Sequence, residues 1–335
     1  MQTSRKFTQG LLALTAMLLL TSVGLAADPG AVYPPESEVS DQKAGSILIF
    51  NIYTSSTSNP GAQNTRFNIT NTSSSSSAFV HLFFIEGSTC NVADRFTCFT
   101  PNQTSTFLAS QEDPGTTGYF VAIAASIVTG CPVSHNFLIG DEYVKFETGH
   151  FANLGAEAFS ALYQGQLPGC DANSVTAQIV FNGVVGSGYN RVPLVLAIDN
   201  IGSPADGNVV RLWINRIGGD LSTSAATLGS FFGILYDDAE GAHSFTIPSG
   251  GCQRGATLSN DFPRTAPRFG LVIPAGSTGW MKFWMPSGLG QLGASINFNA
   301  NAASAAGAFN SGHNMHKLTL SPSNTYTMPI FPPSC

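Results

Sequence analysis

The chain has 335 residues, of which 10% are charged, and 14 Lys and Arg against 20 Asp and Glu give a formal net charge of −6. No cluster of basic residues accompanies this acidity, so the sequence predicts neither a nucleic-acid partner nor attraction to anionic lipid. With 43% hydrophobic residues, the chain is long enough to fill two cores of ordinary size.

The N-terminal segment has the pattern of a secretory signal peptide. Two basic residues precede an apolar run over 10–20, and small residues such as Gly24 and Ala26 follow it. We expect a signal peptide over 1–27 and a secreted or cell-surface protein, with the periplasm as the alternative location. The apolar run is shorter than the roughly 20 residues that a membrane-spanning helix needs, so no membrane span is predicted.

Residues 28–44 are rich in Pro, charged and small residues, which predicts a flexible lead-in. From residue 45 onward, short β-branched and aromatic runs are separated by clusters of Gly, Pro, Asn and Ser. This spacing is typical of an all-β sandwich or barrel. One short helix is predicted over 150–163, because Phe151, Leu154, Ala158 and Leu162 recur at nearly helical spacing.

Several short phrases occur twice in the chain. Phe-x-[Ser/Thr]-Gly-His stands at 146–150 and at 309–313, and it is preceded by "GTTGYF" at 115–120 in one case and "GSTGWM" at 276–281 in the other. "SHNF" and "SINF" lie between these phrases, and further upstream "IFN" is echoed by "VFN". The same order of phrases in both halves indicates a tandem duplication.

The duplication and the strand pattern together define the expected fold. We predict two tandem antiparallel β-sandwich units, of jelly-roll or Ig-like type, over 45–170 and 171–335. They form either two domains or the two halves of one pseudo-symmetric sandwich.

The repeated histidines are interpreted as structural residues. His150 and His313 are expected at equivalent turns of the two copies, with Gly149 and Gly312 supplying a positive φ. His316 stands three residues after His313, and in an extended strand such residues face opposite sides. Joint metal binding by this pair is therefore disfavoured.

The six cysteines include no Cys-x-x-Cys pair, so neither a zinc knuckle nor a thioredoxin-type site is indicated. An even number of cysteines in an exported chain predicts disulfides. Sequence alone does not determine their pairing. The pairs expected from spacing are Cys90–Cys98, Cys131–Cys170 and Cys252–Cys335.

Two further groups are candidates for ligand binding. Asp237, Asp238 and Glu240 follow an apolar run in a predicted loop, where they suit Ca²⁺, a general acid–base pair or a plain solvated turn. Calcium is accordingly the one possible cofactor.

Trp213, Trp280 and Trp284 suit either sugar contact or core packing. All three stand in alternating runs that are expected to form strands. Sugar contact would require their rings to be exposed on a strand face.

The chain contains neither Gly-x-Ser-x-Gly nor His-Glu-x-x-His. The sequence therefore favours an exported structural or adhesive protein without catalytic activity, with polysaccharide binding or self-association as possible partner interactions. A secreted carbohydrate-binding protein and a metal-dependent secreted hydrolase are the alternatives.

Overall fold

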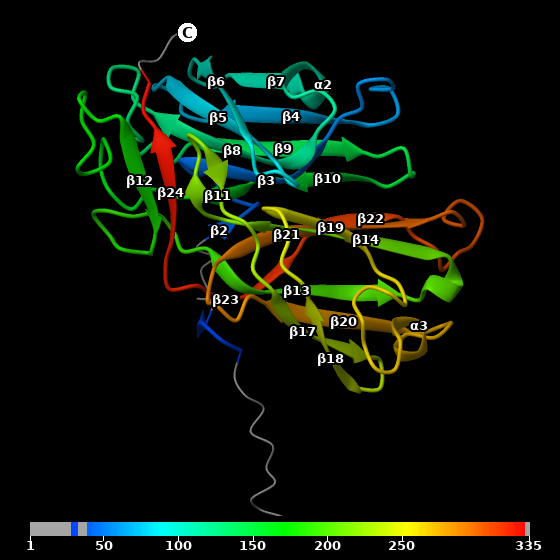
Figure 1. The fold of residues 1–335 in the computed structure, drawn as a ribbon. Helices are drawn as coiled ribbons and strands as arrows, with labels where there is room; N and C mark the ends of the chain where they lie inside the picture. The colour runs from blue at the N-terminus through cyan, green and yellow to red at the C-terminus, as the bar shows by residue number, and fades with distance from the viewer. Residues whose placement is uncertain (1–27, 33–38, 332–335) are drawn as a thin grey trace, which may run out of the picture.

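The computed structural model describes residues 28–32 and 39–331, and the regular secondary structure of these residues is almost entirely β-strand in several sheets, mostly antiparallel (Figure 1). The predicted all-β sandwich class is confirmed. The predicted signal peptide at 1–27 lies outside the described residues. In the described part of the chain, no helix has the length and apolar character needed to cross a membrane.

The first sandwich packs a six-stranded sheet, in the order β2-β11-β3-β8-β5-β6, against a four-stranded sheet, in the order β10-β9-β4-β7. Its elements are β2 Val39–Ser40, β3 Ile47–Thr54, β4 Asn64–Asn71, β5 Ala78–Glu86, β6 Val92–Phe99, β7 Thr104–Leu108, α2 Ala109–Glu112, β8 Thr117–Ala125, β9 Leu138–Lys145, β10 Phe151–Gly155 and β11 Glu157–Phe159.

The second sandwich repeats this plan with the sheets β1-β23-β13-β20-β17-β18 and β19-β14-β21-β22. Its elements are β1 Ala31–Val32, β13 Pro193–Gly202, η1 Pro204–Asp206, β14 Asn208–Arg216, β17 Phe231–Asp237, β18 Ala242–Ile247, β19 Gln253–Thr257, α3 Phe269–Val272, β20 Thr278–Trp284, β21 Gln291–Asn299, β22 Ser311–Asn314 and β23 His316–Leu320.

The two sandwiches correspond strand for strand, from β3 to β11 in one and from β13 to β23 in the other, apart from two short strands at 219–220 and 224–225 that belong to a third sheet. Helices α2 and α3 occupy the same connection. Both also carry a bulge at the same place. Residues 51–52 of β3 and residues 199–200 of β13 each stand opposite one residue of the neighbouring strand. This match agrees with a duplication, which stays a prediction of the sequence.

The matching glycines of "GTTGYF" and "GSTGWM" lie beside these two bulges. A Cβ on Gly118 would stand 1.8 Å from the carbonyl oxygen of Ile85, and one on Gly279 would stand 2.5 Å from that of Tyr236. Both positions therefore exclude any side chain.

A third sheet covers the outer face of the first sandwich and appears beside it in Figure 1. It consists of β12 Thr176–Phe181, β24 Asn324–Pro329, β15 Gly219–Asp220 and β16 Ser224–Ala225. Strands β3 and β5 are consequently covered on both faces, which explains why they are continuous apolar runs. The predicted equivalence of "IFN" and "VFN" was wrong, because "IFN" lies in β3 of the first sandwich, whereas "VFN" lies at the end of β12 in this third sheet and just after it.

The two sandwiches meet in a small apolar core of their own. On the first side it contains Ile52, Val144, Phe146, Ala152 and Leu154, and on the second side Trp213, Ala294 and Ile296. The Phe146 and Trp213 rings are stacked, with centroids 4.9 Å apart and an interplanar angle of 19°. This contact holds the two sandwiches in one arrangement.

Two local predictions were wrong. The expected helix over 150–163 is replaced by β10, whose residues alternate between exposed and buried, and by β11, whose residues are all buried. The expected flexible lead-in at 28–44 includes two paired strands, because Ala31–Val32 pairs with β23 and Val39–Ser40 pairs with β11. Residues 33–38 of this segment lie outside the described residues.

A buried carboxyl lies next to the contact between the sandwiches. Glu142 of β9 is fully buried, and its Oε1 accepts a hydrogen bond of 3.1 Å from the backbone N–H of Ile52. Its Oε2 is buried without a hydrogen-bond partner. Burial raises the pKa of this carboxyl well above its ordinary value, against the opposing effect of the backbone N–H groups of Ile52 and Asn51.

Glu142→Gln is therefore expected to change how stability depends on pH. Because the folded-state pKa is raised, the stability contributed by this group is present below the unfolded pKa of about 4.3 and is lost as pH rises through the folded pKa. As the pH rises through that window, the free energy of unfolding of the variant should increase relative to that of the wild type by up to about 1.4 kcal/mol per pH unit. Urea unfolding at a series of pH values measures this difference. Glu147→Gln, at an exposed position, is the control. Parallel curves for Glu142→Gln and the wild type would contradict the expectation.

Candidate functional site

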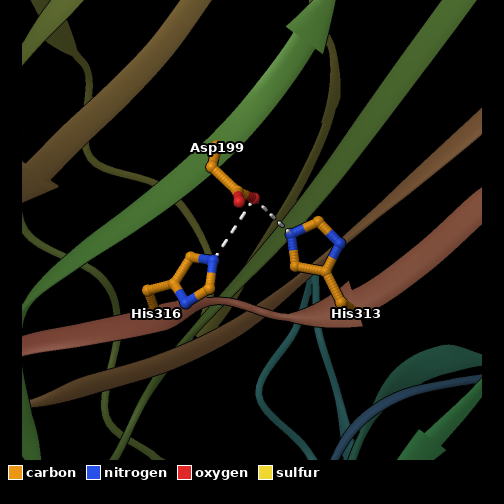
Figure 2. A group of neighbouring side chains, drawn as sticks. All are labelled: Asp199, His313 and His316. Atoms are coloured by element: carbon orange, nitrogen blue, oxygen red, sulfur yellow. Dashed lines mark ion pairs between the residues drawn. The ribbon is translucent and has the colours of Figure 1, made fainter.

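One group of three metal-ligating side chains converges in the described part of the chain, formed by Asp199, His313 and His316 (Figure 2). One ligand atom from each lies within 4.8 Å of the others. The Asp199 Oδ1 is 3.5 Å from the His313 Nε2 and 3.2 Å from the His316 Nε2. The carboxylate thus lies between two imidazoles whose Nε2 atoms both face it.

The three residues come together because two features interrupt regular strands. Asp199 stands in the bulge of β13, where it is exposed. His313 belongs to β22 in one sheet and His316 to β23 in the other, and the buried Met315 between them marks the change of sheet. The histidines therefore do not face opposite sides of one strand. The predicted geometry of this pair was wrong for this reason, and their joint use as metal ligands is taken up as a proposal below.

The electrostatics favour a neutral imidazole at His313. Partial burial lowers the pKa of His313, an effect reinforced by His316 and opposed by Asp199. The His313 Nε2 atom is itself buried and has no hydrogen-bond partner. A neutral imidazole can offer a ring-nitrogen lone pair to a metal ion.

The spacing fits a tetrahedral divalent ion. Ligands about 2.0–2.1 Å from a tetrahedral zinc ion are about 3.3 Å from one another, close to the two Asp199–histidine distances. Two imidazoles and one carboxylate are ligands that zinc and neighbouring transition metals accept, whereas calcium prefers oxygen alone. The arrangement supplies three ligands and leaves a further coordination position for solvent or a partner.

No family model and no curated protein matches this chain. What the site can do therefore rests on its own side chains and their geometry.

The first sandwich does not repeat the cluster. The same backbone contacts occur in both sandwiches: the N–H of Ala156 donates to the Gly140 carbonyl in the first, and the N–H of Met315 donates to the Gly293 carbonyl in the second. In the same way, Glu157 pairs with β3 and His316 pairs with β13. This register and the shared bulge identify the equivalent positions in the first sandwich. Asn51 stands in place of Asp199, Leu154 in place of His313, and Glu157 in place of His316. The metal-ligating set is specific to the second sandwich.

The register also corrects the pairing of the repeated histidines. His150 lies in the turn between β9 and β10, whereas His313 lies within β22, so their predicted equivalence was wrong. His150 is buried, with its Nε2 2.8 Å from the Val209 carbonyl oxygen of the second sandwich and its Nδ1 2.9 Å from the Thr148 hydroxyl. Burial lowers the pKa of His150. These bonds give it a structural place at the contact between the sandwiches.

The two glycines of the repeated phrase serve different needs. Gly149 has a φ of +85°, as expected for a turn. Gly312 stands in β22, where an added Cβ would lie 2.5 Å from the Cβ of Ala152. The turn role predicted for Gly312 was therefore wrong, and its small size instead allows β22 to approach β10.

The predicted carboxylate loop forms the turn between β17 and β18. The Asp237 Oδ1 accepts hydrogen bonds from the backbone N–H groups of Ala239 (3.0 Å) and Gly241 (2.6 Å), while Asp238 and Glu240 are exposed. Within the described residues these three carboxylates do not form a converging metal-ligand group. The turn geometry accounts for Asp237 without calcium.

The three tryptophans have different environments. Trp213 is 1% exposed in the core between the sandwiches, which confirms core packing for this residue and excludes sugar contact by it. Trp280 is 38% exposed and stacks on Tyr236 with ring centroids 4.4 Å apart. Trp284 lies on the same face of β20 and is partly exposed. Sugar contact by these two residues stays a prediction.

The cysteines follow one of the three predicted pairings. Cys131 and Cys170 form a disulfide. Cys90 and Cys252 carry free, buried thiols, so the predicted Cys90–Cys98 and Cys252–Cys335 pairs were wrong. Cys98 is disulfide-bonded, and Cys335 lies outside the described residues.

Proposed function

We propose that this chain is an exported structural or adhesive protein whose second sandwich binds a divalent transition-metal ion of the zinc class. The observation that supports this most is the convergence of Asp199, His313 and His316, with distances suited to shared coordination. Export is inferred from the signal-peptide pattern of the N-terminal sequence.

The position of the cluster suggests what the ion does. Asp199 and His316 belong to the sheet of β13 and β23, and His313 belongs to the edge strand β22 of the facing sheet. An ion bound by all three would tie the two sheets together where the chain crosses between them. Asp199 and His316 are exposed, so a side chain of an adhesive partner or a second copy can reach the open coordination position.

Titration of the metal-free mature chain with ZnCl₂, followed by calorimetry, tests the proposal. We expect one ion per chain, with affinity that falls at acidic pH because protons compete with the ion for the ligand nitrogens. His313→Ala and His316→Ala should each weaken binding by more than the roughly 10- to 100-fold typical of losing an outer-shell partner. At a free zinc concentration of about 100 times Kd, the wild type should gain about 2.7 kcal/mol of stability.

His243→Ala is the matched control. His243 faces one carboxylate, that of Asp237, with 3.7 Å between its Nε2 and the Asp237 Oδ2, and this pair belongs to no converging three-ligand group of the described residues. Zinc binding should be unchanged in this variant. Absence of binding to the wild type, or equal losses in His243→Ala and His316→Ala, would contradict the proposal.

A further inference from the structure

A groove of about 810 Å³ lies where the two sandwiches meet along β10 and β22, which are in contact. Strands β4, β9 and β10 of the first sandwich form most of its wall, and residues 310–312 of the second sandwich complete it. Its volume is within the range of about 300–1,000 Å³ common for ligand pockets. It shares no residue with the metal cluster.

The wall formed by the first sandwich is a regular patch of side chains on the solvent face of one sheet. Arg66, Tyr143 and Asn153 stand side by side across β4, β9 and β10, and Lys145 and Phe151 form the next row. Tyr143 is 45% exposed and Phe151 is 57% exposed. Two exposed aromatic rings in one concave surface are an apolar contact area that the fold itself does not use.

The groove is positively charged on an acidic protein. The Arg66 guanidinium lies 4.5 Å from the centroid of the Tyr143 ring, and Lys145 donates a hydrogen bond to the backbone carbonyl of Gly61. Among the described residues, no Asp or Glu lines the groove. Cations held beside aromatic faces with no neutralising carboxylate favour a ligand that combines negative charge with a flat apolar surface.

We propose that this groove binds an anionic saccharide with uronic-acid units. The C–H face of a pyranose ring would pack on Tyr143 or Phe151, and its carboxylate would pair with Arg66 or Lys145. The side-chain amides of Asn153 and Asn310 can donate to and accept from ring hydroxyls. Because Asn310 belongs to the second sandwich, both sandwiches contact the same ligand.

Binding of polygalacturonate, compared with neutral dextran, tests this assignment. Both are titrated into the full mature chain in the presence of a chelator, so that the metal site does not contribute. The wild type should bind polygalacturonate and not dextran. Arg66→Ala and Tyr143→Ala should each weaken binding by about tenfold to a hundredfold, as expected for loss of a charge-assisted hydrogen bond or a stacked ring. Arg66→Lys keeps the charge and should lose less than Arg66→Ala.

Two controls separate this result from misfolding and from the metal site. His316→Ala removes a metal ligand that does not line the groove, so it should bind polygalacturonate as the wild type does. Thermal unfolding of Arg66→Ala and Tyr143→Ala checks that they fold. Equal binding of dextran, unchanged affinity in these two variants, or binding of polyaspartate as tight as that of polygalacturonate would overturn the saccharide assignment.

Discussion

Replacing Trp213 with alanine is expected to lower the free energy of unfolding by about 3–5 kcal/mol, as for other large aromatic residues removed from cores. Trp213 is 1% exposed, stacks on Phe146 and lies under the Arg211 guanidinium, which is 5.0 Å from its ring centroid. Its removal leaves a cavity between the two sandwiches, where side chains from both must move to fill it. Urea unfolding followed by fluorescence and circular dichroism measures the loss.

Trp280→Ala is the control for this experiment, because it removes the same side chain from a partly exposed position on the outer face of β20. The decrease in the free energy of unfolding should be well below the decrease for Trp213→Ala. If the two variants lose the same stability, or if Trp213→Ala is as stable as the wild type, the contact between the sandwiches contributes less than described above.

A second large effect is expected at Cys90 and Cys252, which we expect to form a third disulfide when the protein is placed in an oxidising compartment. The two buried thiols lie in the same apolar core, and burial, together with the neighbouring Cys90 thiol, raises the pKa of the Cys252 thiol. Cys90 follows β5 in the first sandwich and Cys252 precedes β19 in the second. In an oxidising compartment, a disulfide donor can accept the two electrons and two protons that the thiols release.

This bond would close a long loop between the sandwiches and contribute about 5 kcal/mol in the chain-entropy model. Alkylation of the denatured, non-reduced protein, followed by peptide mapping, shows whether the disulfide has formed. Protein recovered from an oxidising compartment should show no alkylation at Cys90 or Cys252, and Cys90→Ser should leave Cys252 alkylated. The double serine variant should unfold at lower urea than the wild type. Full alkylation of both cysteines in the wild type would contradict the expectation.

The strand content could be predicted from the sequence because β-branched and aromatic residues recur in short runs between turn residues. The segment 150–163 was misread for a specific reason. Its inward positions are Ala152, Leu154, Ala156 and Ala158, which alternate as a strand does. Alanine is also the strongest helix former, so composition hid the alternation. The exposed Phe151 then appeared to belong to an apolar helix face.

The repeated phrases carried true information where backbone geometry requires a particular residue. Gly118 and Gly279 match because each stands beside the same bulge and has no room for a Cβ. The histidine phrases match less well. His150 and His313 belong to the same hairpin in each copy, but they are displaced along it. Short phrases thus identified corresponding regions and did not determine register.

The candidate metal centre could not be predicted from spacing alone. His313 and His316 face one another because the chain changes sheets at Met315, and Asp199 joins them from a bulge that is remote in the sequence. The sheet change and the bulge depend on how distant strands pair. The proposed saccharide groove has the same origin, since its wall combines three strands of one sandwich with the start of β22 from the other.

A crystal of the mature protein soaked in ZnCl₂, with diffraction data collected on both sides of the zinc absorption edge, tests the central claim most directly. The account predicts one anomalous difference peak per chain, within about 2.0–2.2 Å of the Asp199 carboxylate and of the Nε2 atoms of His313 and His316. A zinc peak at another site, or no peak at this cluster in a chain whose fold is otherwise as described, would contradict it.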